Sequence, residues 1–129
     1  QQRRFPESAV TATWSIDLHV PESKNAEQFT GHEFRSVANF GKKKPYAIPY
    51  RCLYSRNIDN LFMAGRNISV THVALGTVRV MRTTGMMGEV VGMAAAVARK
   101  HEATPRAVYE RHLDELKAAL ARGAGKAQP

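Results

Sequence analysis

The sequence lacks the features that mark several classes of protein. It has a single cysteine, Cys52, so it can form neither an intrachain disulfide nor a CxxC motif. We expect Cys52 to be a small buried side chain. The apolar run from Val90 to Ala98 is far shorter than the ~20 residues that cross a bilayer. A disulfide scaffold is therefore excluded, and we expect no membrane partner.

Acidic residues are also scarce, with 11 Asp and Glu against 19 Lys and Arg, for a net charge of +8. Such an excess can indicate an anionic partner such as nucleic acid. Here the basic residues are spread along the chain, and the one tight run, Lys42 to Lys44, lies between Gly41 and Pro45 and is typical of a solvated loop. We therefore predict no nucleic-acid partner.

What is present suffices for one globular core, because 43% of the 129 residues are hydrophobic and 23% are charged. The sequence opens QQRRFPE, with neither an initiator Met nor an apolar leader. We expect the chain to be part of a longer gene product.

The sequence of the N-terminal third predicts a strand and a loop. Apolar and polar residues alternate from Ala9 to Val20, which predicts one two-faced strand that Pro21 stops. The polar stretch from Glu22 to Lys44 predicts a long loop, with one helical turn around Glu33 to Ala38. The stretch NLFMAG, Asn60 to Gly65, predicts a compact apolar strand that ends at a glycine.

Two helices are expected in the C-terminal half. The first runs from Thr77 or Arg79 to about Lys100, and its small residues at a spacing of four predict a face that another backbone can approach closely: Gly88, Gly92 and Ala96. The second runs from Arg106 to about Arg122 and ends near Gly123. Thr104 is its expected N-cap, followed by a proline at the first helical position.

A strand ending at Gly65, then a loop, then a helix start at Gly76, Thr77 and Val78 is a ligand-binding arrangement of open α/β sheets. The glycine permits close backbone approach, and the helix start offers free N–H groups and the positive end of its dipole. Spacing alone indicates an anionic or electron-rich ligand and no particular one.

The residues themselves are more specific. Ile48 to Ala98, from IPYRCLYSRNIDNLFMAGR to GMAAAVA, closely resembles the C-terminal flavin-contacting segment of FAD-dependent oxidoreductases, Rossmann-type flavoproteins related to glutathione-reductase-like FAD enzymes. TWSIDLHVPES resembles a strand of their substrate domain. The resemblance implies an α/β fold class: a C-terminal fragment of a Rossmann-type FAD-binding domain plus part of a β-rich substrate domain, with two C-terminal helices. Residues 1–50 would belong to the substrate domain, 51–122 to the FAD-binding domain, and 123–129 to a flexible tail.

The implied activity is that of an FAD-dependent oxidoreductase acting on a small-molecule substrate such as a sugar or a hydroxy acid. No glycines here have the GxGxxG spacing that holds the ADP half of FAD. We therefore expect the parent protein to bind FAD, and this chain alone to retain none and to be inactive. We also expect self-association, because a helix shaped to lie on a sheet would leave apolar surface exposed. The alternative is an autonomous, non-catalytic α+β binding or assembly module of flavoprotein ancestry.

The resemblance also implies which residues form the site. The cofactor-binding residues, along the ribityl and pyrimidine sides of the flavin, are Ala64, Gly65, Arg66, Asn67, Ile68, Gly76, Thr77 and Val78. Many related flavoproteins have an acid where Arg66 stands, so Arg66 either pairs with the pyrophosphate or points elsewhere.

His72 and Arg79 are the candidate catalytic residues, because they flank the expected flavin loop. The alternatives are a loop histidine that bonds nearby backbone and an arginine that forms a salt bridge with a missing domain. Asp17 and His19 share one face of the expected strand, as an acid–base pair or as the polar side of a sheet. The histidines at 32, 101 and 112 show no metal-ligand spacing, so we predict no metal site.

Overall fold

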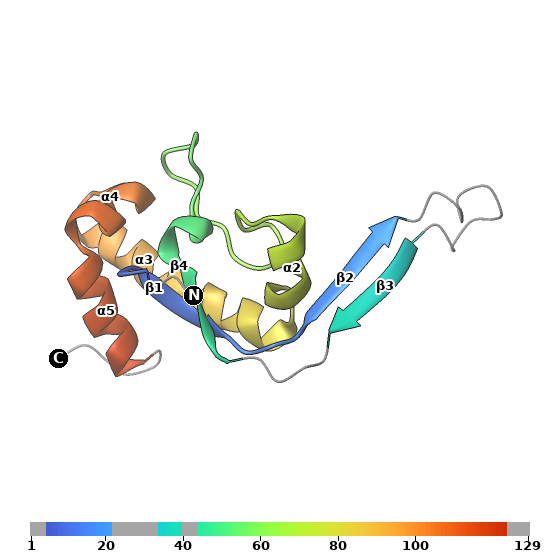
Figure 1. Cartoon of the computed structure of the whole chain (residues 1–129). Coiled ribbons are helices and arrows are strands. Elements are labelled where there is room, and N and C mark those ends of the chain that lie inside the picture. Colours follow the sequence, from blue (N-terminus) through green and yellow to red (C-terminus); the bar gives the residue numbers. More distant parts are fainter. Residues whose placement is uncertain (1–4, 22–33, 40–43, 124–129) are drawn as a thin grey trace.

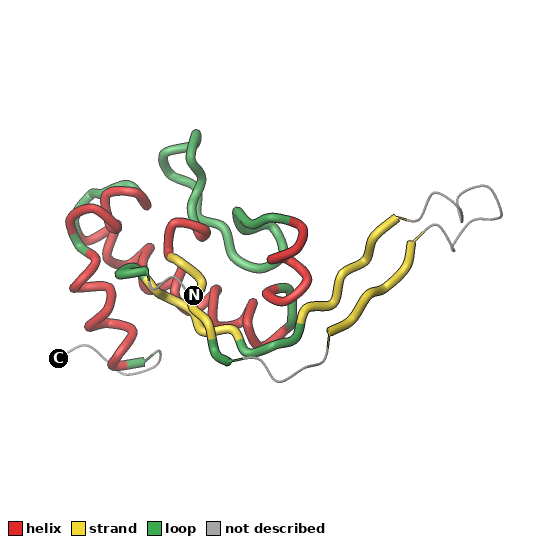
Figure 2. The backbone as a smooth tube through the Cα atoms, in the orientation of Figure 1, coloured by secondary structure: helices red, strands yellow, loops and turns green. Residues whose placement is uncertain are grey.

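The computed structural model describes residues 5–21, 34–39 and 44–123 of the chain, which form a mixed α/β structure (Figures 1 and 2). Its strands are β1 (Ser8–Ala12), β2 (Ile16–Pro21), β3 (Phe34–Asn39) and β4 (Tyr46–Pro49). Its helices are the 3-10 helix η1 (Tyr50–Leu53), α2 (His72–Val78), α3 (Met81–Lys100), α4 (Pro105–Arg111) and α5 (Leu113–Arg122). Among the described helices, none combines the length and apolar character of a membrane span.

The strands form two separate antiparallel pairs. β1 pairs with β4 through Val10↔Ile48 and Ala12↔Tyr46, whereas β2 pairs with β3 along its whole length. The prediction of one strand from Ala9 to Val20 is therefore wrong at its centre, because its two halves take different partners. In Figure 1 the β2–β3 pair starts beside α2 and extends away from the other helices.

Two further local predictions are wrong. The helical turn expected near residues 33–38 is strand β3 from Phe34, because pairing with β2 outweighs the local preference of a short polar stretch. NLFMAG is not a strand of a sheet within the described residues. It forms one isolated bridge, Tyr54↔Phe62, beside a backbone hydrogen bond of 2.8 Å from Met63 N to Leu53 O.

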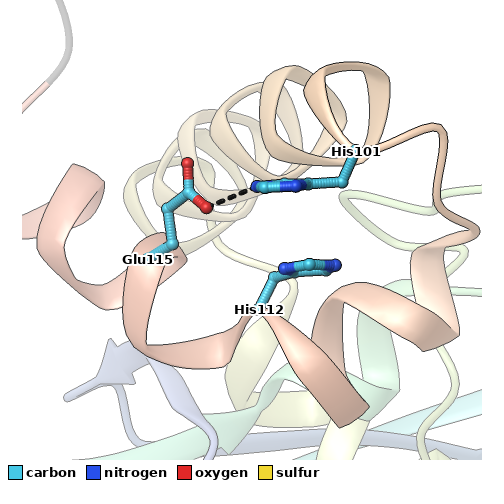
Figure 3. A group of neighbouring side chains, drawn as sticks. All are labelled: His101, His112 and Glu115. Carbon is cyan, nitrogen blue, oxygen red and sulfur yellow. Dashed lines mark hydrogen bonds and ion pairs between the residues drawn. The ribbon is translucent and has the colours of Figure 1, made fainter.

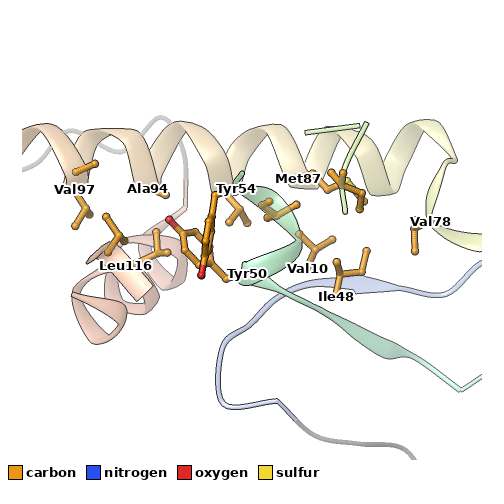
Figure 4. Close-up of a cluster of buried hydrophobic side chains, with 14 of the residues drawn as sticks. Val10, Ile48, Tyr50, Tyr54, Val78, Met87, Ala94, Val97 and Leu116 are labelled. Atoms are coloured by element: carbon orange, nitrogen blue, oxygen red, sulfur yellow. The ribbon is translucent and has the colours of Figure 1, made fainter. Parts of the chain in front are cut away.

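The core lies between one face of α3 and the elements beneath it (Figure 4). Met87, Val90 and Ala94 of α3 are buried with Val10 of β1 and Ile48 of β4. Full burial of a Val, Ile or Met side chain contributes about 1.5–3 kcal/mol, so this seam accounts for much of the stability. The core contains residues from both sides of position 50, so the segments 1–50 and 51–122 share it. The expected division of these segments between two domains stays a prediction. The expected tail lies outside the described residues beyond Gly123.

The small-residue face of α3 is turned away from this core. Gly88, Gly92 and Ala96 are exposed, and a Cβ added at either glycine would meet no atom within 4 Å. No described residue packs closely on this face, so the prediction that another backbone approaches it stays a prediction for the parent protein. The face is turned from the core because the larger apolar residues share the other side of the helix.

The C-terminal end signals are confirmed, although the single expected helix is two. The Thr104 hydroxyl caps α4 by accepting a hydrogen bond of 3.2 Å from Ala107 N, and Gly123 ends α5 with φ +81°. His112 separates the helices with φ −128° and ψ 20°. No proline or glycine marks this break, so the packing of both helices on α3 decides it.

Candidate functional site

The loop expected beside the ribityl chain is held at both ends by backbone hydrogen bonds, from Met63 N to Leu53 O at 2.8 Å and from Ser69 N to Cys52 O at 2.9 Å. Gly65 within it has φ +93°, which L side chains rarely adopt. A Cβ built there would meet only Asn67 Oδ1, at 3.8 Å. The space beside the backbone of Gly65 is therefore open, while the binding of a cofactor there stays a prediction.

The other residues of this loop divide between solvent and core. Arg66 and Asn67 are exposed, whereas the side chain of Ile68 is buried in the core and Ala64 is half-buried against it. Ile68 thus anchors the loop in the core. The polar groups that the loop offers to a ligand come from Arg66, Asn67 and the backbone.

A cavity of about 550 Å³ lies beside the loop, and its lining includes the two residues that flank the loop, Met63 and Ser69. The charged and aromatic part of the lining consists of Arg51, Arg56, Arg106, Tyr54, Tyr109 and Glu110. Three arginines and one carboxylate line this wall, and Glu7 behind it pairs with Arg51, so the wall keeps a small excess of positive charge. Sequence reasoning missed the cavity because α4, which supplies Arg106, lies about fifty residues after the other two arginines; the pair of arginines in YRCLYSR was the one available signal.

The charges on this wall are held in place by neighbours. Arg51 Nε donates to Oε1 of the buried Glu7 at 2.5 Å, and Arg51 Nη2 donates to Tyr109 Oη at 3.2 Å. Arg106 Nη2 donates to the carbonyl oxygen of Arg56 at 3.0 Å. The side chains of Arg51 and Arg106 are therefore oriented before any ligand arrives, which lowers the entropy cost of binding an anion.

Cys52 also lines the cavity, and burial raises the pKa of its thiol despite the opposing effect of Arg51. Because only the thiolate is a strong nucleophile, the raised pKa makes Cys52 a poor one at neutral pH. Cys52 is half-buried against the core and not fully buried as expected.

Gly76, Thr77 and Val78 do not begin a helix, and that expectation is wrong. They form the end of α2, whose N-terminus is capped earlier by Thr71, with its Oγ1 accepting from Ala74 N at 3.3 Å. All three residues are buried. The sequence offered two possible helix starts in this region, and the threonine cap determines which one is used.

These three residues are occupied by contacts within the chain. A Cβ on Gly76 would lie 2.8 Å from the carbonyl oxygen of Asp17, so this glycine lets α2 approach β2. Thr77 Oγ1 donates to the Trp14 carbonyl oxygen at 2.6 Å and lies 2.5 Å from Tyr46 Oη. Val78 belongs to the core. Their observed role is to fix α2 against the strands.

His72 and Arg79 stand at opposite ends of α2, seven residues or about 10 Å apart along the axis. His72 is exposed at the first helical residue, whereas Arg79 Nη2 donates to Asp17 Oδ2 at 2.6 Å. The salt bridge of Arg79 is therefore made with Asp17 of this chain, whereas the alternative expectation placed its partner in a missing domain. The side chain of His19 lies outside what the structure describes, which leaves the proposed Asp17–His19 pair a prediction.

The helix that follows begins at Met81, close to one of the expected starts. Its N-cap residue, Val80, has no side-chain hydrogen bond to the N–H groups of the first turn, and Met81 and Arg82 are exposed there. The N-terminus of α3 is therefore available to an acceptor outside the helix.

A second group of polar side chains lies at the other end of α3. The sequence shows no metal-ligand spacing among the histidines, yet the fold brings His101 and His112 together with Glu115 (Figure 3). Their potential ligand atoms lie within 4.8 Å of one another. Sequence spacing does not show this group because its side chains meet through tertiary packing at the ends of different helices.

Comparison with known proteins identifies the family. Residues 1–120 match the model of the FAD dependent oxidoreductase family, which covers nearly the whole chain. No curated protein and no solved structure matches the chain. With an open glycine loop, a basic cavity beside it and this match, the chain belongs to the FAD-dependent oxidoreductase family.

Proposed function

We propose that the chain is the part of an FAD-dependent oxidoreductase that holds the ribityl and pyrimidine sides of the flavin and forms part of the substrate pocket. The observation that carries this proposal is the loop at Gly65, with its positive φ and open backbone, beside a cavity lined by three arginines. The family match over residues 1–120 supplies the cofactor class. Within the family, the resemblance of Ile48 to Ala98 supports the proposal that the chain is related to the glutathione-reductase-like enzymes.

The described residues fit one side of the cofactor. The backbone of Ala64 and Gly65 would lie along the ribityl chain, and Arg66 and Asn67 would bond its hydroxyls or the pyrophosphate, because both side chains are exposed on the loop. The N-terminus of α3, at Met81, would offer N–H groups and a positive dipole to the pyrimidine edge. FAD, when bound, supplies the redox chemistry. In this proposal Gly76, Thr77 and Val78 support the site indirectly by holding α2.

The basic cavity narrows the substrate class. Arg51, Arg56 and Arg106 offer several N–H donors to an anion, and arginine matches the geometry of a carboxylate. A hydroxy acid therefore suits this wall better than a neutral sugar. The exposed His72 would move a proton, and the Asp17–Arg79 pair would hold α2 in position or bind a substrate oxygen.

A second candidate is a non-catalytic binding or assembly module of the same ancestry. It is favoured by the commitment of Gly76, Thr77 and Val78 to internal packing and by the absence of GxGxxG spacing from the sequence. Under either candidate we expect the isolated chain to retain no FAD. Its titration with FAD should show no saturable quenching below ~100 μM, which corresponds to less than about 6 kcal/mol of binding free energy.

The two candidates are separated by variants of the complete protein. His72→Ala and Arg79→Ala should slow flavin reduction by substrate roughly 30-fold to 1000-fold, or about 2–4 kcal/mol, with flavin content unchanged. Gly65→Asn should lower the flavin-to-protein ratio, since Asn tolerates positive φ and its side chain fills the open space. Arg122→Ala, an exposed change at the end of α5, is the control for loss of a cation.

The outcomes of these variant experiments decide between the two candidates. If both His72→Ala and Arg79→Ala reduce flavin at the parent rate, neither residue takes part in the chemistry. Should Gly65→Asn keep a full complement of flavin, the loop does not lie against the cofactor. A complete protein that never binds flavin would leave only the non-catalytic module.

A further inference from the structure

The polar group at the far end of α3 is built by three elements. His101 follows the last residue of α3, His112 lies between α4 and α5, and Glu115 is in the first turn of α5. The two imidazole rings stack with their centroids 3.9 Å apart and an angle of 11° between their planes (Figure 3). His101 Nε2 lies 2.6 Å from Glu115 Oε2, as the dashed line in Figure 3 marks.

We propose that His101, His112 and Glu115 bind a divalent transition-metal ion of the zinc type. Imidazole nitrogen and carboxylate oxygen are ligands that such ions prefer, and three protein ligands leave a fourth position for water. The site is independent of the flavin loop and of the basic cavity, whose lining contains none of the three residues. The proposal thus goes beyond the oxidoreductase function and does not depend on it.

The geometry is close to what a metal needs. Ligand atoms about 2.0 Å from a tetrahedral ion lie about 3.3 Å from one another. The three ligand atoms already lie within 4.8 Å of each other, so side-chain rotations of modest size bring them into range. One stacked ring must tilt so that both lone pairs meet at the ion. The surroundings permit this, because the side chains of His101 and Glu115 are 30% and 34% exposed.

A lysine next to the group organises the carboxylate. Lys100 Nζ donates to Glu115 Oε1 at 2.8 Å, and the other oxygen, Oε2, faces His101. Lys100 therefore holds one carboxylate oxygen and leaves the second as the metal ligand, which would exchange its bond to His101 for a bond to the ion. A neighbour that orients a ligand in this way is typical of metal sites.

A bound ion would tie the end of α3 to the start of α5. Because the three ligands are brought together only by the fold, an ion that binds them stabilises the folded state in proportion to the logarithm of its concentration over its Kd. The expected role is to fasten the C-terminal helices, with no part in the flavin chemistry.

The test adds Zn²⁺ alone to the metal-free protein and follows the melting temperature and the Kd. The parent should be stabilised, whereas His101→Gln, His112→Gln and Glu115→Gln should each bind at least about tenfold more weakly. Asp114→Asn is the matched control, because it removes a carboxylate from the same turn of α5 whose side chain is fully exposed, and it should bind as the parent does. Equal affinity across all variants, or no stabilisation of the parent, overturns the proposal.

Two readouts on the parent keep the proposal testable if a variant fails to fold. Co²⁺ in place of Zn²⁺ should give the visible absorption of a tetrahedral site, and Zn²⁺ should shift the imidazole nitrogen resonances of His101 and His112. Unchanged resonances of these two histidines at saturating Zn²⁺ would equally overturn the proposal.

Discussion

Replacing Gly76 with alanine separates a packing role from a cofactor role for this residue. In α2 the added Cβ would lie 2.8 Å from the carbonyl oxygen of Asp17 and 3.1 Å from Leu18 Cδ2. Real Cβ atoms essentially never approach backbone oxygen so closely, so α2 or β2 must move. The substitution should therefore destabilise the fold whether or not a flavin is present.

The magnitude follows from two opposing terms. Alanine is favoured over glycine in a helix interior by about 1 kcal/mol, and forcing extra volume into a packed contact costs about 1–3 kcal/mol. Gly88→Ala is the matched control, since Gly88 also lies within a helix but a Cβ there meets nothing within 4 Å. It should gain the helix term alone, which leaves Gly76→Ala less stable than Gly88→Ala by about 1–3 kcal/mol.

Thermal and urea unfolding of both variants measure this difference. In a chain of this size 1 kcal/mol corresponds to about 3–5 °C in melting temperature, so Gly88→Ala should melt above the parent and Gly76→Ala well below Gly88→Ala. Equal upward shifts in the two variants would refute the packing argument. A loss of flavin by Gly76→Ala with unchanged stability would restore the residue to the cofactor site.

The remaining predictions concern the core, pH and association. Tyr50→Phe should lower the free energy of unfolding by about 0.5–1.5 kcal/mol in urea titrations, because it removes the hydrogen bond of 3.0 Å that the buried Tyr50 hydroxyl donates to the carbonyl oxygen of Pro105, the first residue of α4. Hydrogen bonds from Lys100 and His101 lower the pKa of Glu115 from 4.5 to about 2. The stability that this carboxylate contributes is therefore fully present above pH 4.5 and is lost as the pH falls toward 2. Glu115→Gln should flatten the plot of unfolding free energy against pH in this range. Met81 is 89% exposed at the start of α3, and Met81→Lys should reduce the self-association that we propose, as light scattering would measure; an unchanged mass distribution would exclude this surface.

The parts of the fold that were predicted correctly have local causes. Thr104 and Gly123 mark helix ends through capping and a positive φ, which a few neighbouring residues determine. The alternation of Val10 and Ala12 against Thr11 correctly gives the buried face of β1. The break between β1 and β2 has no such local signal, because it arises from the two strands that they pair with.

The features of the candidate site likewise differ in whether a local sequence signal marks them. The open glycine of the loop was predictable, since Gly65 follows an apolar run and precedes polar residues. Gly76 was misplaced because a glycine needed for contact with a strand and one needed at a ligand look alike in sequence. The basic cavity forms where α4 packs beside η1 and the segments that follow it, and the His101–His112 stack forms where the ends of α3 and α4 meet, so only the tertiary packing reveals them.

The visible spectrum of the complete protein, recorded before and after anaerobic addition of hydroxy acids and sugars, tests the central claim most directly. The account predicts a stoichiometric flavin band that bleaches with a hydroxy acid, because the cavity beside the Gly65 loop is lined by Arg51, Arg56 and Arg106. Neutral sugars should bleach it less. A complete protein purified without flavin, and unable to take it up from added FAD, would contradict the proposed oxidoreductase function.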